Sequence, residues 1–370
     1  MSIRHHFIST RRIFSVLLYA IILLQETRTT GALTTGQQHQ QQRASQFYPA
    51  FLERLPSLEG RTVVVTGCSR GLGYATASSV VKKGGSLIML NRKSKRSTEV
   101  LAELTEIAAT TNRESSSSSH AALAPRLVEC DLLDFSSVRK ACAQIRADTD
   151  ELHVLCNNAG IMLQPDEPSV DGYDITASTN VLSHFLITKE LFPLLKRASA
   201  ASSPRIVNMS SLSGYGGPLD PRFFQRRGGN LGGSRASMNR YSQSKLANLV
   251  FTVALDDRLR QDNDKDHVLA LACTPGLCGT DMFVHATTVM TGQPAPRDRV
   301  PSAEDGAMAQ LHCIFSSDVQ SGDLWGPKLG SESGELELMR PIGPPQILVD
   351  DTAKEQLWNA CEEAVGTFDL

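Results

Sequence analysis

Short apolar runs that alternate with longer helical stretches constrain this chain more than any other feature. Between Arg61 and Cys273 each β-branched or apolar run is followed by a segment with helical periodicity. This alternation predicts a single α/β domain with a doubly wound parallel sheet and helices on both faces. We expect strands at 61–66, 87–90, 126–130, 152–156, 205–209 and 267–273, and helices at 71–83, 97–110, 135–147, 173–197 and 241–260.

Composition excludes several classes of function. The 37 basic and 39 acidic side chains give a formal net charge of −2, so no overall field draws the chain to nucleic acid or an anionic membrane. The eight cysteines show no C-x-x-C spacing and are too few for a disulfide scaffold, and we expect no metal site. Three of them fall near predicted strand ends, as small buried hydrophobic groups or as redox-sensitive thiols.

The first 50 residues differ from the rest of the chain. Three arginines precede the apolar run 13–24, which at about 12 residues suits the core of a signal peptide and is shorter than a membrane-spanning helix. Residues 1–32 are therefore predicted to be a signal peptide or a retained signal anchor, with a buried helix as the alternative. The Gln-rich residues 33–50 are a predicted linker. We expect the folded domain near Phe51, and localisation to the secretory route or the endoplasmic reticulum, or to a plastid in an alga.

Three segments inside the predicted domain, 51–370, depart from the alternating pattern. Residues 112–125 include a serine run and are interpreted as a low-complexity insertion. Residues 214–238 are rich in glycine and arginine and look irregular. Residues 280–300 are first apolar and then Pro-rich, which favours a lid over an apolar pocket, although packing against the sheet would explain them too.

A glycine-rich turn follows the first predicted strand directly. The sequence T-G-C-S-R-G-L-G places Gly67, Gly71 and Gly73 at the start of an Ala/Ser/Val helix. Glycine lets the backbone approach a pyrophosphate, and the helix N-terminus offers it unpaired N–H groups and a positive dipole end. Many turns need glycine only for conformation, but the strand, turn and helix context favours a dinucleotide site.

The end of the second strand bears on which dinucleotide binds. An NAD-preferring site places an acidic residue there for the ribose 2′-hydroxyl, whereas this chain has Asn91 followed by Arg92. Arg70 lies in the glycine-rich turn and faces the same corner. Two guanidinium groups can clamp a 2′-phosphate, so we expect NADP, with NADPH preferred over NADH. The alternative is that the basic run 92–96 is an ordinary solvated helix start.

Three further motifs follow in order. C-N-N-A-G ends at Gly160, R-I-V-N-M-S-S-L-S-G contains Ser211, and Y-S-Q-S-K places Tyr241 and Lys245 on one helical face. With the glycine-rich turn, they resemble the short-chain dehydrogenase/reductase family over about 300 residues, and most closely its retinol-dehydrogenase-like and WW-domain-containing oxidoreductase-like members. The resemblance implies a Rossmann-type sheet.

The resemblance also implies a catalytic set. Reduction of a carbonyl needs a proton on oxygen as hydride reaches carbon, and a tyrosine with a pKa near 10 ionises too rarely to serve the reverse reaction. Tyr241 is the expected acid/base, Lys245 is expected to lower its pKa, and Ser211 to hold the substrate oxygen. Asn180 matches the asparagine that holds a water beside the lysine, although it could instead bond the backbone.

Cofactor contacts are implied residue by residue. Asp131 matches a position that contacts adenine, or it caps the helix at Phe135. Thr280 matches the threonine that bonds the nicotinamide carboxamide, whereas the preceding Pro-Gly could be a plain turn. The full expected set is Gly67, Ser69, Arg70, Gly71, Leu72, Gly73, Asn91, Arg92, Asp131, Leu132, Asn158, Ala159, Gly160, Tyr241, Lys245, Pro275, Gly276 and Thr280.

These features predict an NADP-dependent oxidoreductase that acts on the carbonyl or alcohol of a hydrophobic small molecule, such as a retinoid, steroid or lipid aldehyde. A protochlorophyllide-reductase-like enzyme that reduces a double bond is one alternative, and a cofactor-binding sensor or scaffold without turnover is another. Membrane association through the N-terminal run is expected. Family members often form dimers or tetramers through the helices at Tyr173 and Tyr241, so a homo-oligomer is expected too.

Overall fold

One twisted sheet organises the computed structural model of this chain. Its strand order is β3-β2-β1-β4-β5-β6-β7-β8, with every neighbouring pair parallel except β7 and β8. The strands are β1 Thr62–Thr66, β2 Ser86–Asn91, β3 Arg126–Glu129, β4 Val154–Asn157, β5 Arg205–Met209, β6 Leu269–Cys273, β7 Leu324–Pro327 and β8 Leu336–Leu338. The structure describes residues 43–114, 123–215, 217–226, 231–261, 268–328, 335–339 and 349–370.

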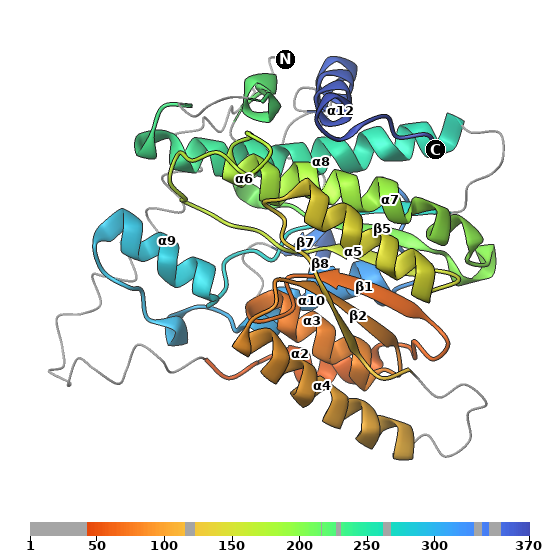
Figure 1. The fold of residues 1–370 in the computed structure, drawn as a ribbon. Coiled ribbons are helices and arrows are strands. Elements are labelled where there is room, and N and C mark those ends of the chain that lie inside the picture. The colour runs from red at the N-terminus through yellow and green to blue at the C-terminus, as the bar shows by residue number, and fades with distance from the viewer. Residues whose placement is uncertain are drawn as a thin grey trace, which may run out of the picture.

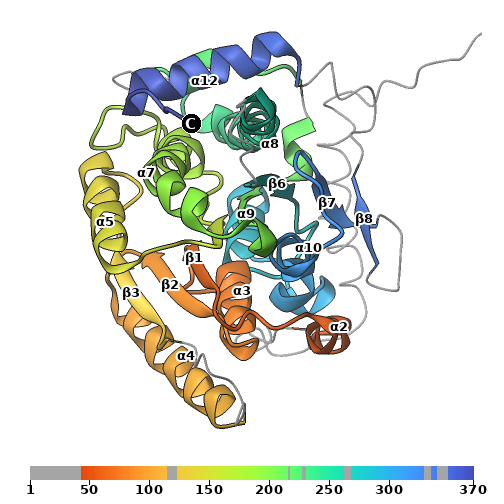
Figure 2. The same cartoon turned by 90° about the vertical axis from the view of Figure 1, so that its right-hand side faces the viewer.

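Helices cover both faces of this sheet, which confirms the predicted doubly wound α/β class in a single domain (Figure 1). In Figure 2 helices α2, α3, α4 and α10 lie on one side of the strands, and α5, α7, α8 and α12 on the other. The helices are α2 Tyr48–Arg54, α3 Gly71–Lys82, α4 Lys95–Glu114, α5 Phe135–Asp148, α6 Ile175–Ala177, α7 Ser183–Arg197, α8 Ser237–Gln261, α9 Asp281–Thr291, α10 Ala303–Phe315 and α12 Asp351–Val365.

Alternate strand residues supply two separate hydrophobic cores. Val63 and Val65 of β1 join the core beneath α3 and α10, whereas Val64 joins the core beneath α7 and α8. Successive strand side chains point to opposite faces, so a strand buried on both sides is apolar throughout. This is why β1 stands out in the sequence as an unbroken β-branched run.

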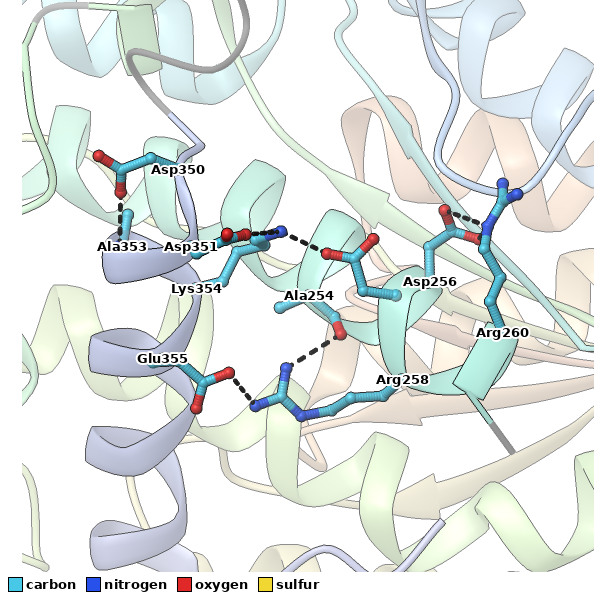
Figure 3. A network of polar contacts seen from close by, with 10 residues as sticks. Ala254, Asp256, Arg258, Arg260, Asp350, Asp351, Ala353, Lys354 and Glu355 are labelled. Carbon is cyan, nitrogen blue, oxygen red and sulfur yellow. Dashed lines mark hydrogen bonds and ion pairs between the residues drawn. The ribbon is translucent and has the colours of Figure 1, made fainter. Parts of the chain in front are cut away.

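The C-terminal helix α12 packs across α8 and extends the second core. Trp358 stacks on Phe368, and both rings pack against Phe185 of α7. Figure 3 shows the polar contacts at the rim of this packing: Arg258 of α8 pairs with Glu355 at 2.9 Å. The Arg258 guanidinium also lies 4.0 Å from the centre of the Trp358 ring. Helix α12 thus covers part of the face of α8 that points away from the sheet.

The fold begins earlier than the expected boundary near Phe51, so the predicted linker 33–50 is partly inside the domain. Tyr48 of α2 is buried, and its hydroxyl lies 2.9 Å from Ser79 Oγ. The carboxylate of Asp305, in the first turn of α10, accepts the backbone N–H groups of residues 46–48 at 2.9–3.0 Å. A contact between segments more than 250 residues apart has no local sequence signal.

The predicted targeting segment 1–32 lies outside the described residues, as do residues 115–122 of the expected insertion 112–125. The first residues of that insertion are helical, because α4 continues to Glu114. Among the residues that the structure describes, no helix has the length and apolar character to cross a membrane. The targeting segment and its compartment stay predictions.

The predicted single helix 173–197 is interrupted near its start. A short α6 is followed by a π-helical turn, η3 Ser178–Leu182, and then by α7. A π-turn inserts one extra residue into the helical ladder and is frequent at functional sites. Asn180 lies in the middle of this turn. Its side-chain oxygen accepts the N–H of Ile161, in the segment after β4.

Candidate active site

The glycine-rich turn joins the carboxyl end of β1 to α3. Gly67 and Gly71 have φ values of +75° and +56°, a region that glycine adopts at little cost. A Cβ on Gly73 would lie 2.1 Å from the carbonyl oxygen of Gly67, so only glycine permits this helix to approach the turn so closely. No side chain caps α3 at Arg70, and its first N–H groups are left for an anion. The cradle fits a dinucleotide pyrophosphate.

Asn91 at the end of β2 supports this turn from beneath. Its Oδ1 accepts the N–H of Cys68 at 2.9 Å, and its Nδ2 donates to Ser69 Oγ at 2.7 Å. The side chain is buried, so it shapes the turn. Arg92 beside it is exposed, and the Arg70 side chain is 66% exposed. Arg96, in the basic run 92–96, also contacts this turn, since its Nε donates to Ser69 O at 3.3 Å.

The N-N-A-G segment is bound to the same turn. Thr66 Oγ1 accepts the N–H groups of Asn158 and Ala159, both at 2.9 Å, and Asn158 Nδ2 donates to Thr66 O at 2.8 Å. Asn157 bonds Asn208 Oδ1 across the sheet at 2.9 Å. The segment therefore supports the central strands and lies beside the turn, a position compatible with the cofactor contacts expected of Asn158, Ala159 and Gly160.

At the end of β3 one alternative from the sequence is wrong. Asp131 does not cap α5, because Asp134 is the N-cap residue and accepts the N–H groups of Ser136 and Ser137. Asp131 Oδ1 instead accepts the N–H of Leu133 at 3.0 Å and stays half-buried at the carboxyl edge of the sheet. The position of Asp131 is therefore compatible with the adenine contact predicted for it, and the cofactor contact expected of Leu132 stays a prediction.

Tyr241 and Ser211 come together at the carboxyl end of β5. The Tyr241 side chain is buried, and burial raises the pKa of its hydroxyl to about 12, while a hydrogen bond with Ser211 acts to lower it. The neighbouring Ser210 points elsewhere, since its Oγ donates to Lys245 O at 2.7 Å. Ser211 is thus the serine that meets the tyrosine, a position compatible with its predicted role of holding the substrate oxygen.

Lys245 lies one helical turn after Tyr241 on α8. Its Nζ donates to Met209 O at 2.9 Å and lies 5.8 Å from the centre of the Tyr241 ring. Burial lowers the pKa of Lys245 itself to about 8. Desolvation is the largest influence on the pKa of the buried Tyr241 phenol, and the lowering of that pKa by Lys245 stays a prediction.

Asn180 is fully buried and binds the segment that follows N-N-A-G. Its Oδ1 accepts the N–H of Ile161 at 2.9 Å, and its Nδ2 donates to Ile161 O at 3.0 Å and Ser244 Oγ at 2.9 Å. A Cβ on Gly160 would lie 3.4 Å from Asn180 Oδ1 and 3.5 Å from Lys245 Nζ. Gly160 therefore brings the asparagine and the lysine to one place.

An apolar wall surrounds Tyr241. Met162, Leu163 and Ala286 form a buried cluster with the tyrosine ring, and Met238, Met282 and Met290 pack against it. Two of these methionines come from α9, so the predicted lid supplies part of the wall. Leu163 has a φ of +55°, a left-handed conformation that costs a branched residue energy and is frequent at functional sites. No sequence motif marks Met162 or Met238 as part of this wall.

Residues 274–280 join β6 to α9. Gly276 has a φ of +66°, and a Cβ there would lie 2.7 Å from Pro327 Cγ. Thr280 Oγ1 caps α9 by accepting the N–H of Phe283 at 3.3 Å, while its Cγ2 lies 3.3 Å from the position of a Gly71 Cβ. Thr280 thus borders the glycine-rich turn, and the cofactor contacts expected of Pro275, Gly276 and Thr280 stay predictions.

A separate cavity of about 600 Å³ opens at the opposite edge of the sheet. Its lining includes Thr62, Ser86, Arg126 and Asp148, and none of the predicted site residues lines it. In parallel α/β sheets, ligands bind at the carboxyl ends of the strands. The constellation around Tyr241 lies at those ends, beside the point between β1 and β4 where the strand order reverses, and is the better candidate.

Comparison with known proteins agrees with this geometry. The family model for short chain dehydrogenases matches residues 61–220. Human retinol dehydrogenase 14 is 32% identical over 84% of this chain and 87% of that protein. The chain belongs to the short-chain dehydrogenase/reductase family. An uncharacterised oxidoreductase of Schizosaccharomyces pombe is also 32% identical, over 63% of this chain and 65% of that protein.

Among solved structures, an uncharacterised protein from Mycobacterium paratuberculosis superimposes on this short-chain dehydrogenase/reductase with a TM-score of 0.61 and 28% identity. The match covers 88% of this chain and 100% of that protein. Oxidoreductase chemistry with a nicotinamide cofactor is the shared property of the family, which confirms the predicted class of enzyme.

Proposed function

We propose that this chain is an NADP(H)-dependent oxidoreductase that interconverts the carbonyl and alcohol of a hydrophobic small molecule, of the retinoid, steroid or lipid aldehyde class. One observation carries the proposal: the Tyr241 hydroxyl meets Ser211 inside a wall of methionine and leucine side chains. A proton donor in an apolar enclosure suits a substrate whose only polar group is the reacting oxygen. The relationship to human retinol dehydrogenase 14 supports the same substrate class.

The chain's own residues suit this chemistry. The turn at Gly67, Gly71 and Gly73 would hold the pyrophosphate of the dinucleotide, which supplies or accepts the hydride when bound. Ser211 orients the substrate oxygen, and Tyr241 donates a proton to it during reduction or removes one during oxidation. The raised pKa leaves Tyr241 protonated at neutral pH, the state in which it can donate a proton during reduction.

The preference for NADPH rests on the corner beside Asn91. β2 ends at Asn91 instead of an acidic residue, Arg92 follows it, and Arg70 and Arg96 belong to or contact the turn that Asn91 supports. Cationic side chains recognise a 2′-phosphate by charge-assisted hydrogen bonds. Membrane association and self-association remain parts of the proposal for which the N-terminal run and the helices α7 and α8 are the candidate elements.

The test is oxidation of NADPH by the purified protein with retinal, steroid ketones and long-chain aldehydes, repeated with NADH and with Tyr241→Phe. Turnover that depends on Tyr241 and prefers NADPH would support the proposal. Tight NADPH binding without turnover on any carbonyl would overturn it. Reduction of a pigment double bond would then identify a protochlorophyllide-reductase-like enzyme, and inactivity there too would indicate a sensor or scaffold.

A further inference from the structure

Arg240 is a charged residue in an unusual position. It directly precedes Tyr241 on α8, and it is the largest of the fully buried side chains in the described part of the chain, with a side-chain exposure of 0%. Burying a guanidinium is costly unless every charge and donor finds a partner. Arg240 has no role in the proton transfer proposed for Tyr241 and Ser211.

The guanidinium joins three segments that are separate in sequence. Its Nη1 donates to Gly233 O at 2.7 Å, and its Nη2 donates to Gln164 O at 2.9 Å. Its Nε lies 3.1 Å from Asp174 Oδ2, and Asp166 Oδ2 lies 4.0 Å from Nη1. Asp166 Oδ2 also accepts the N–H of Gly233 at 3.0 Å. One cation therefore holds two carboxylates and two backbone carbonyls.

Two of these segments border the site around Tyr241. Gln164 directly follows Met162 and Leu163, which form the apolar wall. Its side chain donates to Met162 O at 3.0 Å and lies 3.3 Å from His285 on α9. Asp174 caps α6, which leads into the π-turn that carries Asn180. Gly233 belongs to the Gly/Arg-rich segment 214–238, whose role the sequence left open.

Stability alone does not require an arginine here. A buried ion pair is often no more stabilising than apolar side chains of the same volume, whereas it holds its partners in one geometry. Adjacent residues of a helix are rigidly linked, so the position of Arg240 and that of the Tyr241 hydroxyl are set together. The contacts of Arg240 thus set the distance between the tyrosine and the wall at Met162 and Leu163.

We propose that Arg240 is a positioning residue that determines how the substrate fits against Tyr241, by holding residues 161–168 and the segment at Gly233 against α8. This inference rests on the proposed function. It assigns residues 231–236 of the Gly/Arg-rich segment a place in the substrate wall, with Gly233 bound through Arg240 and Asp166.

The test compares Arg240→Lys with Arg205→Lys. Arg205 is a matched control, because it too is buried and donates from Nη1 to two backbone carbonyls, of Cys313 at 3.1 Å and Ser316 at 2.7 Å. It lies at the opposite, amino end of β5. A lysine cannot span the carbonyls that a guanidinium joins, so both variants lose stability.

We expect Arg240→Lys to raise the KM for the carbonyl substrate about tenfold with a smaller change in kcat and unchanged NADPH binding. Arg205→Lys should leave KM at the wild-type value. An unchanged KM in Arg240→Lys, or equal changes in both variants, would overturn the proposal. If Arg240→Lys does not fold, Asp166→Asn tests the same cluster, since it keeps an acceptor for Gly233 and removes the charge. A wild-type KM in Asp166→Asn would then overturn it.

Failure of the proposed function is distinguishable from failure of this inference. Absence of Tyr241-dependent turnover in the wild-type protein would refute the function alone. Amide hydrogen exchange then tests Arg240 directly: residues 161–168 and 231–236 should exchange faster in Arg240→Lys than in the wild type, and unchanged in Arg205→Lys. Equal exchange in these segments for all three proteins would refute the positioning role.

Discussion

Arg70 in the glycine-rich turn and Asp281, the first residue of α9, form an ion pair with Nη1 and Oδ2 3.0 Å apart. Arg297 pairs with the other carboxylate oxygen of Asp281. The arginine proposed to bind the 2′-phosphate is therefore also a contact of the lid. An anion at this corner and Asp281 compete for the same guanidinium, which links cofactor binding to the start of α9.

Asp281→Asn is expected to strengthen NADPH binding about two- to fivefold, because it removes the competing carboxylate from a largely exposed pair. NADH, which has no 2′-phosphate, should bind as it does to the wild-type protein. Fluorescence titration with both cofactors measures the difference. Equal changes in the two affinities would show that Arg70 does not meet the phosphate.

Arg92→Asp is expected to weaken NADPH binding by on the order of 10- to 100-fold, because it removes a charge-assisted hydrogen bond and adds repulsion. NADH affinity should change much less. Lys93→Asp, on the next exposed residue, makes the same charge change and serves as the control. Unaltered selectivity between the two cofactors in Arg92→Asp would remove Arg92 from the site.

Tyr241→Phe is expected to reduce turnover by about 10²- to 10⁴-fold, the usual contribution of a positioned proton donor. The ring still fills its place against Met162 and Leu163, so NADPH affinity should stay near that of the wild type. Steady-state kinetics and cofactor titration separate the two effects. Loss of both together would indicate misfolding instead of a lost acid.

The burial of Lys245 predicts that the free energy of unfolding rises with pH. Burial lowers its pKa from 10.5 to about 8 in the folded state, so the unfolded chain binds more protons between these values. The free energy of unfolding should therefore increase from about pH 8 to 10, by on the order of 2 kcal/mol, relative to Lys245→Met. Above pH 10 the raised pKa of Tyr241 acts in the opposite direction.

Urea unfolding at pH 7.5 and 9.5 of the wild type and Lys245→Met measures this difference. Lys245→Met fills the same buried volume and has no charge to titrate, so its own pH dependence reports the other groups. Parallel pH dependences for the two proteins would mean that Lys245 is not desolvated in the folded state.

The first six strands and the turn at Gly67 could be predicted from the sequence, because each depends on local periodicity and on residues next to each other in the chain. For the same reason Tyr241 and Lys245 were identifiable from their spacing on one helix. The elements after residue 300 were not predicted: α10 contains Gly306, β7 is short and contains Gly326 and a proline, and β8 pairs antiparallel.

What tertiary structure alone decided is the chemical environment of the predicted residues. The contact between Asp305 and the residues before Phe51, the methionine wall around Tyr241 and the partners of Arg240 all join segments far apart in the sequence. Burial then raised the pKa of Tyr241 and lowered that of Lys245. Residue types and spacing determine which groups can react, whereas desolvation and partner geometry exist only once distant segments have packed.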